Sequence, residues 1–218
     1  FSDFVYNFSI YENFQAGSVV GVLKAEDPEN SRSRLKYFIV DGDGVGLFSI
    51  DSKGVIRTTE ILDHEVNTRY WLTVKAEDDA AVPLSSIVHV VIKVLDKNDH
   101  APFPRKPIYF ASVLENSADA FVAQVRAYDK DEIAKGMLQS GVPLFTYEIV
   151  GGDPQSFFSI DSIHGVLVTQ STRLLDREKQ KEHTISIRIC DRDPSPLCTT
   201  VPVVVTVADV NDNAPEFR

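Results

Sequence analysis

The sequence predicts an all-β protein made of two tandem β-sandwiches, and three observations support this prediction. The chain repeats itself once, at a spacing of just over 100 residues. Apolar and polar residues alternate over short segments, as they do in strands that bury one face. Clusters of Gly, Pro, Asp and Asn separate these segments at intervals of roughly ten residues. We therefore expect about seven strands in each sandwich.

Four short motifs recur in the same order in both halves of the chain. The pairs are YEN and LEN at 11–13 and 114–116, LFSID and FFSID at 47–51 and 157–161, LDHE and LDRE at 62–65 and 175–178, and DKNDH and DVNDN at 96–100 and 209–213. Both copies of the last motif are followed by Ala-Pro. We therefore predict a first repeat at residues 1–100, a second at 101–213, and the start of a further repeat at 214–218.

The spacing between equivalent residues changes inside the second copy. Asp27 and Asp129 lie 102 positions apart, whereas Leu47 and Phe157 lie 110 positions apart. The difference places an insertion of eight residues within 132–144, which we expect to be a loop special to the second repeat.

Strand alternation also predicts which side chains face outward. Trp71, the only Trp of the chain, stands between inward-facing Tyr70 and Leu72, so we expect it on the outer face of a sheet. It is there either an isolated surface aromatic or an interface anchor. Asn7 is also expected to point outward, and Asn-Phe-Ser at 7–9 forms the only N-glycosylation sequon, which leaves glycosylated and unmodified Asn7 as alternatives.

Composition excludes several classes of partner. The chain has 22 basic and 32 acidic residues, and this net charge of -10 repels phosphate, so we expect no nucleic-acid partner. The longest apolar stretches, at 88–95 and 201–210, are half the length of a membrane-spanning helix. We expect membrane attachment only through parts of the protein outside this chain, and any secretion signal to be removed or to lie upstream.

The acidic residues gather in the recurring motifs, at strand ends and at the junction between the repeats. The segment 96–100 offers carboxylates, an Asn amide and backbone carbonyls within a few residues. These oxygen donors are the ligands that Ca²⁺ prefers, whereas zinc would favour His and Cys. A solvated acidic surface is the alternative, but it does not account for the ordered repetition.

The carboxylate pairs within LDHE at 62–65 and LDRE at 175–178 also raise glycoside hydrolysis as an alternative. Neither pair has a neighbouring aromatic platform for a sugar, and the duplication would require two identical active sites. The chain contains no GxSxG, HExxH or phosphate-binding loop motif. We therefore expect no enzymatic activity and no small-molecule substrate.

Five motifs resemble the calcium-binding motifs of cadherin extracellular repeats: Glu12, LDHE at 62–65, DKNDHAP at 96–102, DKD at 129–131 and Asp191. The resemblance covers the whole chain, with the motifs in the family's order in two copies. It implies two Greek-key sandwiches of immunoglobulin-like topology joined by a calcium-binding linker. It also implies an extracellular position, in the ectodomain of a single-pass plasma-membrane protein.

The resemblance further implies three Ca²⁺ ions between the repeats. The ligands would be Glu12, Asp63, Glu65 and Asp99 for the first ion; Glu12, Glu65, Asp96, Asp99, Asp131 and the carbonyl of Lys97 for the second; and Asn98, Asp129, Asp131, Asp191 and the carbonyl of His100 for the third. The eight carboxylates carry a charge of -8, which three divalent ions reduce to -2. At 4 Å each like-charged pair costs about 1 to 4 kcal/mol, so we expect a hinge that repels itself without calcium and stiffens with it.

The same motifs imply a calcium half-site at each end of the chain. The upstream half-site would consist of Asp27, Glu29 and Asp78, and Glu29 stands where the family has Asp. We expect another repeat before this one, because the upstream set is otherwise intact. The downstream half-site would consist of Glu115, Asp176, Glu178, Asp209, Asn211, Asp212 and Asn213. Without a third repeat we expect one or more ions to occupy it only partly.

Cys190 and Cys198 flank a short turn, and the repeat alignment places them on two adjacent antiparallel strands. In an oxidising extracellular setting we expect a disulfide between them, with two buried free thiols as the alternative. The first repeat has Glu77 and Ser85 at the equivalent positions, so the fold does not depend on the bridge.

These observations predict calcium-dependent cell adhesion by a segment of a non-type-I cadherin, similar to the protocadherins or to the giant Fat and Dachsous group. The partner would be another cadherin-family ectodomain, of the same or a different protein. Strand exchange is disfavoured because Ser2 stands where type I cadherins have Trp. The alternative function is a mechanical spacer within a long extracellular rod, with no direct partner contact.

Overall fold

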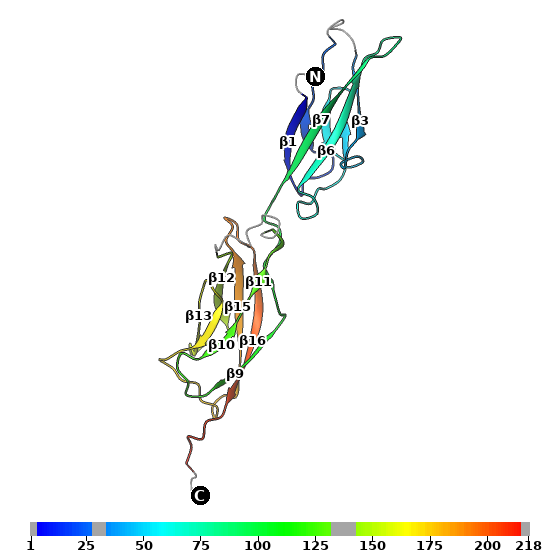
Figure 1. Ribbon diagram of the computed structural model, residues 1–218. Helices are drawn as coiled ribbons and strands as arrows, with labels where there is room; N and C mark the ends of the chain where they lie inside the picture. The colour runs from blue at the N-terminus through cyan, green and yellow to red at the C-terminus, as the bar shows by residue number, and fades with distance from the viewer. Residues whose placement is uncertain (1–3, 28–33, 132–142, 215–218) are drawn as a thin grey trace. The chain divides into compact units, whose positions relative to one another are not determined.

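The computed structural model describes residues 4–27, 34–131 and 143–214. The chain forms two compact units, Phe1–Lys97 and Asn98–Arg218, and β-strands dominate both of them (Figure 1). Of the predicted insertion at 132–144, residues 132–142 lie outside the described residues, as does Glu29 of the upstream half-site.

The first unit is a sandwich of a four-stranded and a three-stranded sheet. Its strands are β1 (Val5–Tyr11), β2 (Val19–Val22), β3 (Lys36–Asp41), β4 (Phe48–Ile50), β5 (Val55–Thr58), β6 (Arg69–Glu77) and β7 (Ser85–Leu95). The strand orders are β1-β7-β6-β3 and β2-β5-β4. Only β1 and β7 pair in parallel, and the other described neighbours are antiparallel.

The second unit repeats this arrangement and adds a small sheet. Its strands are β8 (Phe103–Pro104), β9 (Tyr109–Leu114), β10 (Phe121–Gln124), β11 (Ala127–Tyr128), β12 (Phe145–Gly151), β13 (Phe158–Ile160), β14 (Val166–Thr169), β15 (Glu182–Asp191) and β16 (Cys198–Ala208). The two larger sheets, ordered β12-β15-β16-β9 and β10-β14-β13, hold the expected seven strands. The short strands β8 and β11 pair separately, and the rings of Phe103 and Tyr128 lie 5.3 Å apart across them.

Alternation along the strands builds each core. On β6 and β7 of the first unit, Leu72 and Val90 are completely buried against Ile56 of the opposite sheet. Burying each such side chain contributes about 1.5 to 3 kcal/mol, so the long alternating strands supply much of the stability. Trp71 lies between two buried residues of β6 and is 43% exposed, as the alternation predicts.

The parallel pairing of the first and last long strands determines how each sandwich connects to the rest of the chain. Strand β1 pairs with β7 in the first unit, and β9 pairs with β16 in the second. Because each pair is parallel, the chain enters a sandwich at one end and leaves it at the other. Each unit can therefore be joined end to end with further repeats.

The predicted disulfide is present between Cys190 and Cys198, which face each other at the end of the β15-β16 hairpin. The same register in the first unit pairs Glu77 with Ser85, as the repeat alignment predicts. The bridge therefore reinforces a hairpin that forms in both repeats, with or without it.

A buried histidine distinguishes the core of the second unit. His183 is 4% exposed and packs edge-on against Phe157 and Phe158, with ring centroids 5.4 and 5.5 Å away. In the first unit Tyr70 takes the equivalent place, edge-on to Phe48 at 5.5 Å. Burial lowers the pKa of His183 below its ordinary value of 6.5, because an imidazolium loses its hydration there.

We therefore predict that His183 makes the second repeat less stable in mild acid. The contribution of neutral His183 is fully present above pH 6.5, and it is lost as the pH falls through the lowered pKa of the folded state. Urea unfolding in chelator at pH 7.5 and 5.5 should show that acid lowers the stability of the wild type relative to that of His183→Tyr. The exposed His164→Gln variant should behave as the wild type; an unchanged pH dependence in His183→Tyr would contradict the prediction.

Candidate metal centre

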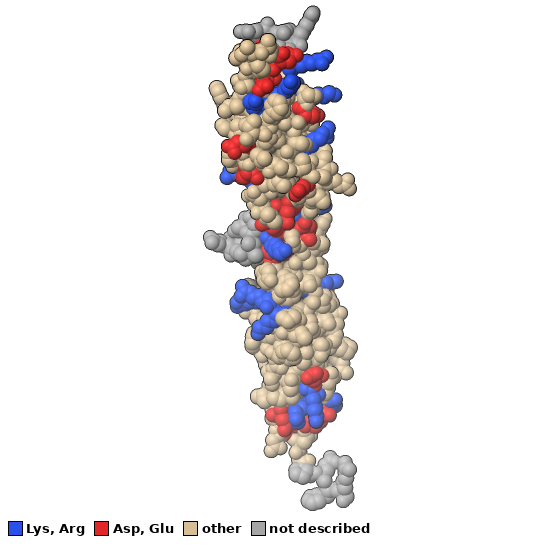
Figure 2. All heavy atoms as spheres, turned by 90° about the vertical axis from the view of Figure 1, so that its right-hand side faces the viewer, with Lys and Arg blue, Asp and Glu red and all other residues tan. Residues whose placement is uncertain are grey.

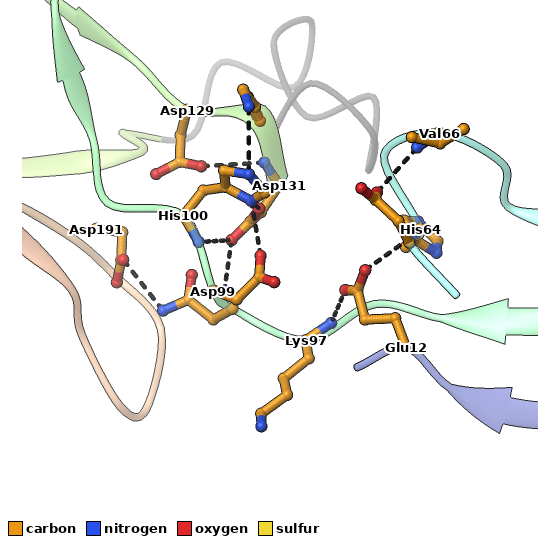
Figure 3. A network of polar contacts seen from close by, with 12 residues as sticks. Glu12, His64, Val66, Lys97, Asp99, His100, Asp129, Asp131 and Asp191 are labelled. Atoms are coloured by element: carbon orange, nitrogen blue, oxygen red, sulfur yellow. Dashed lines mark hydrogen bonds and ion pairs between the residues drawn. The ribbon is translucent and has the colours of Figure 1, made fainter. Parts of the chain in front are cut away.

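A buried glutamate stands at the end of the first strand of each sandwich. Glu12 follows β1, is 1% exposed, and accepts hydrogen bonds from two backbone amides, that of His64 to Oε2 at 2.6 Å and that of Lys97 to Oε1 at 2.7 Å (Figure 3). These charge-assisted bonds stabilise the carboxylate, and each oxygen keeps a lone pair for a cation. Glu12 therefore joins the end of β1 to the LDHE loop and to the segment after β7.

The second repeat builds the same arrangement from different neighbours. Glu115 follows β9, is 1% exposed, and accepts hydrogen bonds from the amides of Arg177 and Val210, both at 2.8 Å. These two amides hold the pKa of the Glu115 carboxyl below its ordinary range. The glutamate of the YEN and LEN motifs thus has the same structural role in both repeats.

The asparagine after each glutamate forms the turn that directs the carboxylate inward. Asn13 and Asn116 have φ of 61° and 59°, in the left-handed region that Asn tolerates better than most residues. The backbone N–H groups of Asn13 and Asn116 donate to the carbonyl oxygens of Leu62 and Leu175, each at 3.0 Å. Both leucines are buried. The YEN and LEN motifs therefore encode a strand end, a buried ligand and the turn that follows.

Two further carboxylates lie beside each buried glutamate. The carboxylate oxygens of Glu12, Asp63 and Glu65 lie within 4.8 Å of one another, and both oxygens of Glu65 are inaccessible to solvent. In the second repeat Glu115, Asp176 and Glu178 form the equivalent group. Three such negative charges repel one another strongly, and an oxygen-binding divalent cation would offset two of them.

His64, within the LDHE loop, is buried, although the loop around it is polar. It is 8% exposed, and its Nδ1 lies 2.9 Å from the carbonyl oxygen of Val94. The loop turns inward because Glu12 holds the His64 amide, and the ring then packs under the end of β7. The second repeat has Arg177 at this position, so the repetition carried no signal for the burial of His64.

The start of the second unit forms a separate group of ligands around Asp131. This residue is 1% exposed, and its Oδ2 accepts hydrogen bonds from the amides of Asp99 at 3.1 Å and His100 at 3.2 Å (Figure 3). The amide of Asp131 in turn donates to Asp129 Oδ1 at 3.0 Å. The predicted ligands Asp99, Asp129 and Asp131 are thus brought together by their own backbone.

Asp191 and Asn98 complete this group. Asp191 is 3% exposed, and its Oδ2 accepts hydrogen bonds from the Asn98 side chain at 3.1 Å and from the Leu197 amide at 3.0 Å. Because Cys190 precedes Asp191 directly, the disulfide lies beside this ligand. It joins the two strands at the point where the loop between β15 and β16 begins and ends. Within the second unit, the structure therefore gathers Asn98, Asp99, Asp129, Asp131 and Asp191.

His100 enters the same group through its side chain, whereas the sequence predicted a role for its carbonyl only. Its Nδ1 lies 2.6 Å from Asp99 Oδ1 and 2.8 Å from Asp131 Oδ1. Burial alone would lower the pKa of His100, but the Asp131 hydrogen bond and the charges of both aspartates raise it above its ordinary value. The imidazole therefore has a strong electrostatic interaction with two predicted calcium ligands.

At the downstream half-site, the predicted ligands pair with one another and with basic side chains. At the downstream end Asn116 donates to Asp212 at 2.6 Å, Asp209 pairs with Arg177 at 3.2 Å, and Asn213 donates to Asp212 at 2.7 Å. Asn211 is exposed, and the Lys179 ammonium, 2.7 Å from Asp176, lowers the pKa of that carboxyl. Figure 2 shows charged side chains gathered toward this end of the second unit, beyond a largely uncharged middle.

The upstream half-site is described only in part, through Asp27 and Asp78. Oδ1 of Asp78 accepts hydrogen bonds from the amides of Ala80 at 3.2 Å and Leu84 at 3.1 Å. Asp27 is half-buried. Among the residues that the structure describes, neither aspartate belongs to a group of three His, Cys, Asp or Glu ligands.

The comparisons with known proteins agree with this architecture. Residues 6–95 and 109–208 match the Cadherin domain family. The chain belongs to the cadherin family. Because cadherin repeats are structural adhesion domains, it is not an enzyme.

Several large cadherins are similar to this chain over most of its length. Human Protocadherin Fat 1 is 40% identical over 220 residues, which cover 100% of this chain and 5% of that protein. Cadherin-4 of Caenorhabditis elegans is 45% identical over 189 residues, which cover 84% of this chain and 4% of that protein. These similarities confirm the predicted likeness to the Fat group, and the chain spans about one twentieth of each relative.

The fold is also that of solved cadherin ectodomains. The crystal structure of mouse Cadherin-23 EC22-24 aligns with a TM-score of 0.83 at 24% identity, covering 97% of this chain and 66% of that one. The crystal structure of human CDH23 EC21-23 aligns with a TM-score of 0.78 at 22% identity, covering 99% of this chain and 76% of that one. These likenesses confirm the predicted cadherin fold.

We predict that the turn at Asn13 contributes to stability mainly through its backbone. Asn13→Ala should lower the free energy of unfolding by about 1 to 2 kcal/mol, because most side chains are strained in the left-handed region. Asn13→Gly should cost much less, since Gly adopts this conformation freely. Urea unfolding in chelator measures both variants. Equal losses would assign the effect to the Asn side chain instead.

Proposed function

We propose that this chain is a calcium-binding segment of an extracellular cadherin adhesion receptor. The observation that carries the proposal is the buried Glu12, held by two backbone amides with Asp63 and Glu65 beside it. Its counterpart Glu115 has the same surroundings in the second repeat. Buried carboxylates held this close together suit an oxygen-coordinated divalent ion better than a solvated surface.

We assign three Ca²⁺ ions to the place where the chain passes from the first repeat to the second. The segment 96–100 connects the repeats directly and would contribute ligands to both sets. Glu12, Asp63, Glu65, Asp96 and the Lys97 carbonyl would bind from the first repeat, and Asn98, Asp99, the His100 carbonyl, Asp129, Asp131 and Asp191 from the second. The ions would supply the positive charge that lets these carboxylates lie together, and the linker would stiffen.

The partner in this proposal is another cadherin-family ectodomain, of the same or a different protein. The family membership and the similarity to Protocadherin Fat 1 support an adhesive role outside the cell. Among the described residues no helix has the length and apolar character needed to cross a membrane. In this proposal, other parts of the receptor attach it to the plasma membrane.

A spacer function is the second candidate, and two observations favour it. Each sandwich receives the chain at one end and releases it at the other, as a link in a rod does. The relatives are about twenty times longer than this chain, which leaves room for many such links. A spacer would set distance and transmit force without contacting a partner itself.

The proposed sharing of ligands gives a test of the calcium assignment. Asp131→Ala and Glu65→Ala should each weaken two ions, whereas Asp63→Ala and Asp191→Ala should each weaken one. Wild-type dissociation constants should lie at about 10⁻⁴ to 10⁻³ M, as in other extracellular modules. Calorimetric calcium titration measures the number and affinity of the ions, and identical results for all four variants would contradict the assignment.

Sedimentation velocity at high protein concentration distinguishes the adhesive function from the spacer function. With millimolar calcium we expect an association that a chelator reverses, because a stiffened pair of repeats presents its faces in a fixed arrangement. A monomer that remains monomeric in calcium but changes its frictional ratio in chelator would favour the spacer. No response to calcium in either property would contradict the calcium proposal itself.

A further inference from the structure

The imidazole of His100 lies between two carboxylates that belong to the same compact unit. Its Nδ1 is 2.6 Å from Asp99 Oδ1 and 2.8 Å from Asp131 Oδ1, and the ligand atoms of the three residues lie within 4.8 Å of one another (Figure 3). One nitrogen and two oxygens thus converge on a single point. We propose that Asp99, His100 and Asp131 bind a divalent transition metal, represented by Zn²⁺, which competes with Ca²⁺ for the two aspartates.

The deepest of the three ligands is already held in position for a metal. Asp131 is 1% exposed, and its Oδ2 accepts hydrogen bonds from the amides of Asp99 and His100. These bonds leave Oδ1 directed at the imidazole. Outer hydrogen bonds that orient a ligating carboxylate are a regular feature of metal sites, because they reduce the reorganisation that binding requires.

The distances need only a small change to admit a metal ion. Two ligands about 2.0 to 2.2 Å from a tetrahedral Zn²⁺ lie about 3.3 Å from each other. The nitrogen–oxygen distances at His100 would therefore open by about half an ångström or slightly more. Asp99 and His100 are both partly exposed, so their side chains have room to move, and water would fill the fourth position.

The ligand types favour a transition metal over calcium at this point. Calcium takes oxygen ligands and gains little from an imidazole, whereas Zn²⁺ binds imidazole nitrogen and carboxylate oxygen together. In the DKNDH motif His100 replaces the Asn213 of DVNDN, so only the first copy offers the nitrogen. The inference is therefore specific to the first copy of the motif, and it rests on the geometry of His100 whether or not calcium binds.

Lys130 opposes metal binding through its contact with His100. Its Nζ lies 3.3 Å from His100 Nε2. A neutral imidazole that binds metal through Nδ1 carries a hydrogen on Nε2, which cannot accept a hydrogen bond from the ammonium. Lys130 is exposed and can turn away, so Lys130→Gln should strengthen metal binding while leaving the three ligands in place.

The test uses the full chain and its His100→Asn variant. The variant has, at position 100, the residue type of Asn213 in the DVNDN motif. Zn²⁺ is titrated in calcium-free buffer with a competing chelating indicator, and Co²⁺ serves as an absorption probe of nitrogen coordination. We expect one Zn²⁺ to bind at least tenfold more tightly to the wild type than to His100→Asn. Equal zinc affinities in the two proteins would overturn the proposal.

A second histidine provides the matched control. His64 also lies within 4.8 Å of two carboxylates, those of Glu65 and Asp96, so His64→Gln tests whether zinc binds there instead. The His64→Gln variant should retain the tight zinc step and the Co²⁺ spectrum. Loss of that step in His64→Gln, with retention in His100→Asn, would assign the metal to the other group and overturn the proposal.

Competition with calcium completes the test and separates it from the proposed function. Zinc at one equivalent should raise the apparent calcium dissociation constant of the wild type severalfold and leave that of His100→Asn unchanged. Simultaneous, independent binding of both metals would contradict the competition. If neither protein binds calcium while the wild type still binds zinc tightly, the calcium proposal fails and the zinc site stands.

Discussion

A buried glutamate held by two backbone amides organises the end of each sandwich. Its negative charge is removed from water, so it must receive hydrogen bonds, and the donors come from two segments far away in the sequence. Glu12 draws its donors from residues 52 and 85 positions later. The strand end, the LDHE or LDRE loop and the segment after the last strand are thereby tied together in each repeat. The neighbouring carboxylates inherit their positions from this arrangement.

The same arrangement couples the stability of the sandwich to the charge around it. The core strands supply the apolar burial, while the glutamate and its neighbours concentrate repulsion at the end of the unit. A cation bound there would offset this repulsion. Parallel pairing of the first and last strands makes the chain leave at the opposite end from its entry. In the proposed function, ion binding would act on the connection between repeats while each core remains intact.

Differences between the two copies show which features the fold requires. The glutamate, the left-handed asparagine and the buried leucine occur in both repeats. The disulfide, the core histidine His183 and the side chain of His100 occur in one repeat only. Features present in both repeats belong to the shared architecture, and those present in one repeat are not required by the fold.

The amino-acid sequence alone determined the duplication, the strand faces, the place of the two cysteines on adjacent strands and most of the candidate ligands. These properties depend on local patterns, namely period-two alternation, turn residues and motif order, which a linear sequence records directly. The tertiary structure decided that His64 is buried, that amides hold Glu12 and Glu115, and that His100 lies between two aspartates. Such contacts depend on how distant segments pack around a buried charge, and no local pattern records that packing.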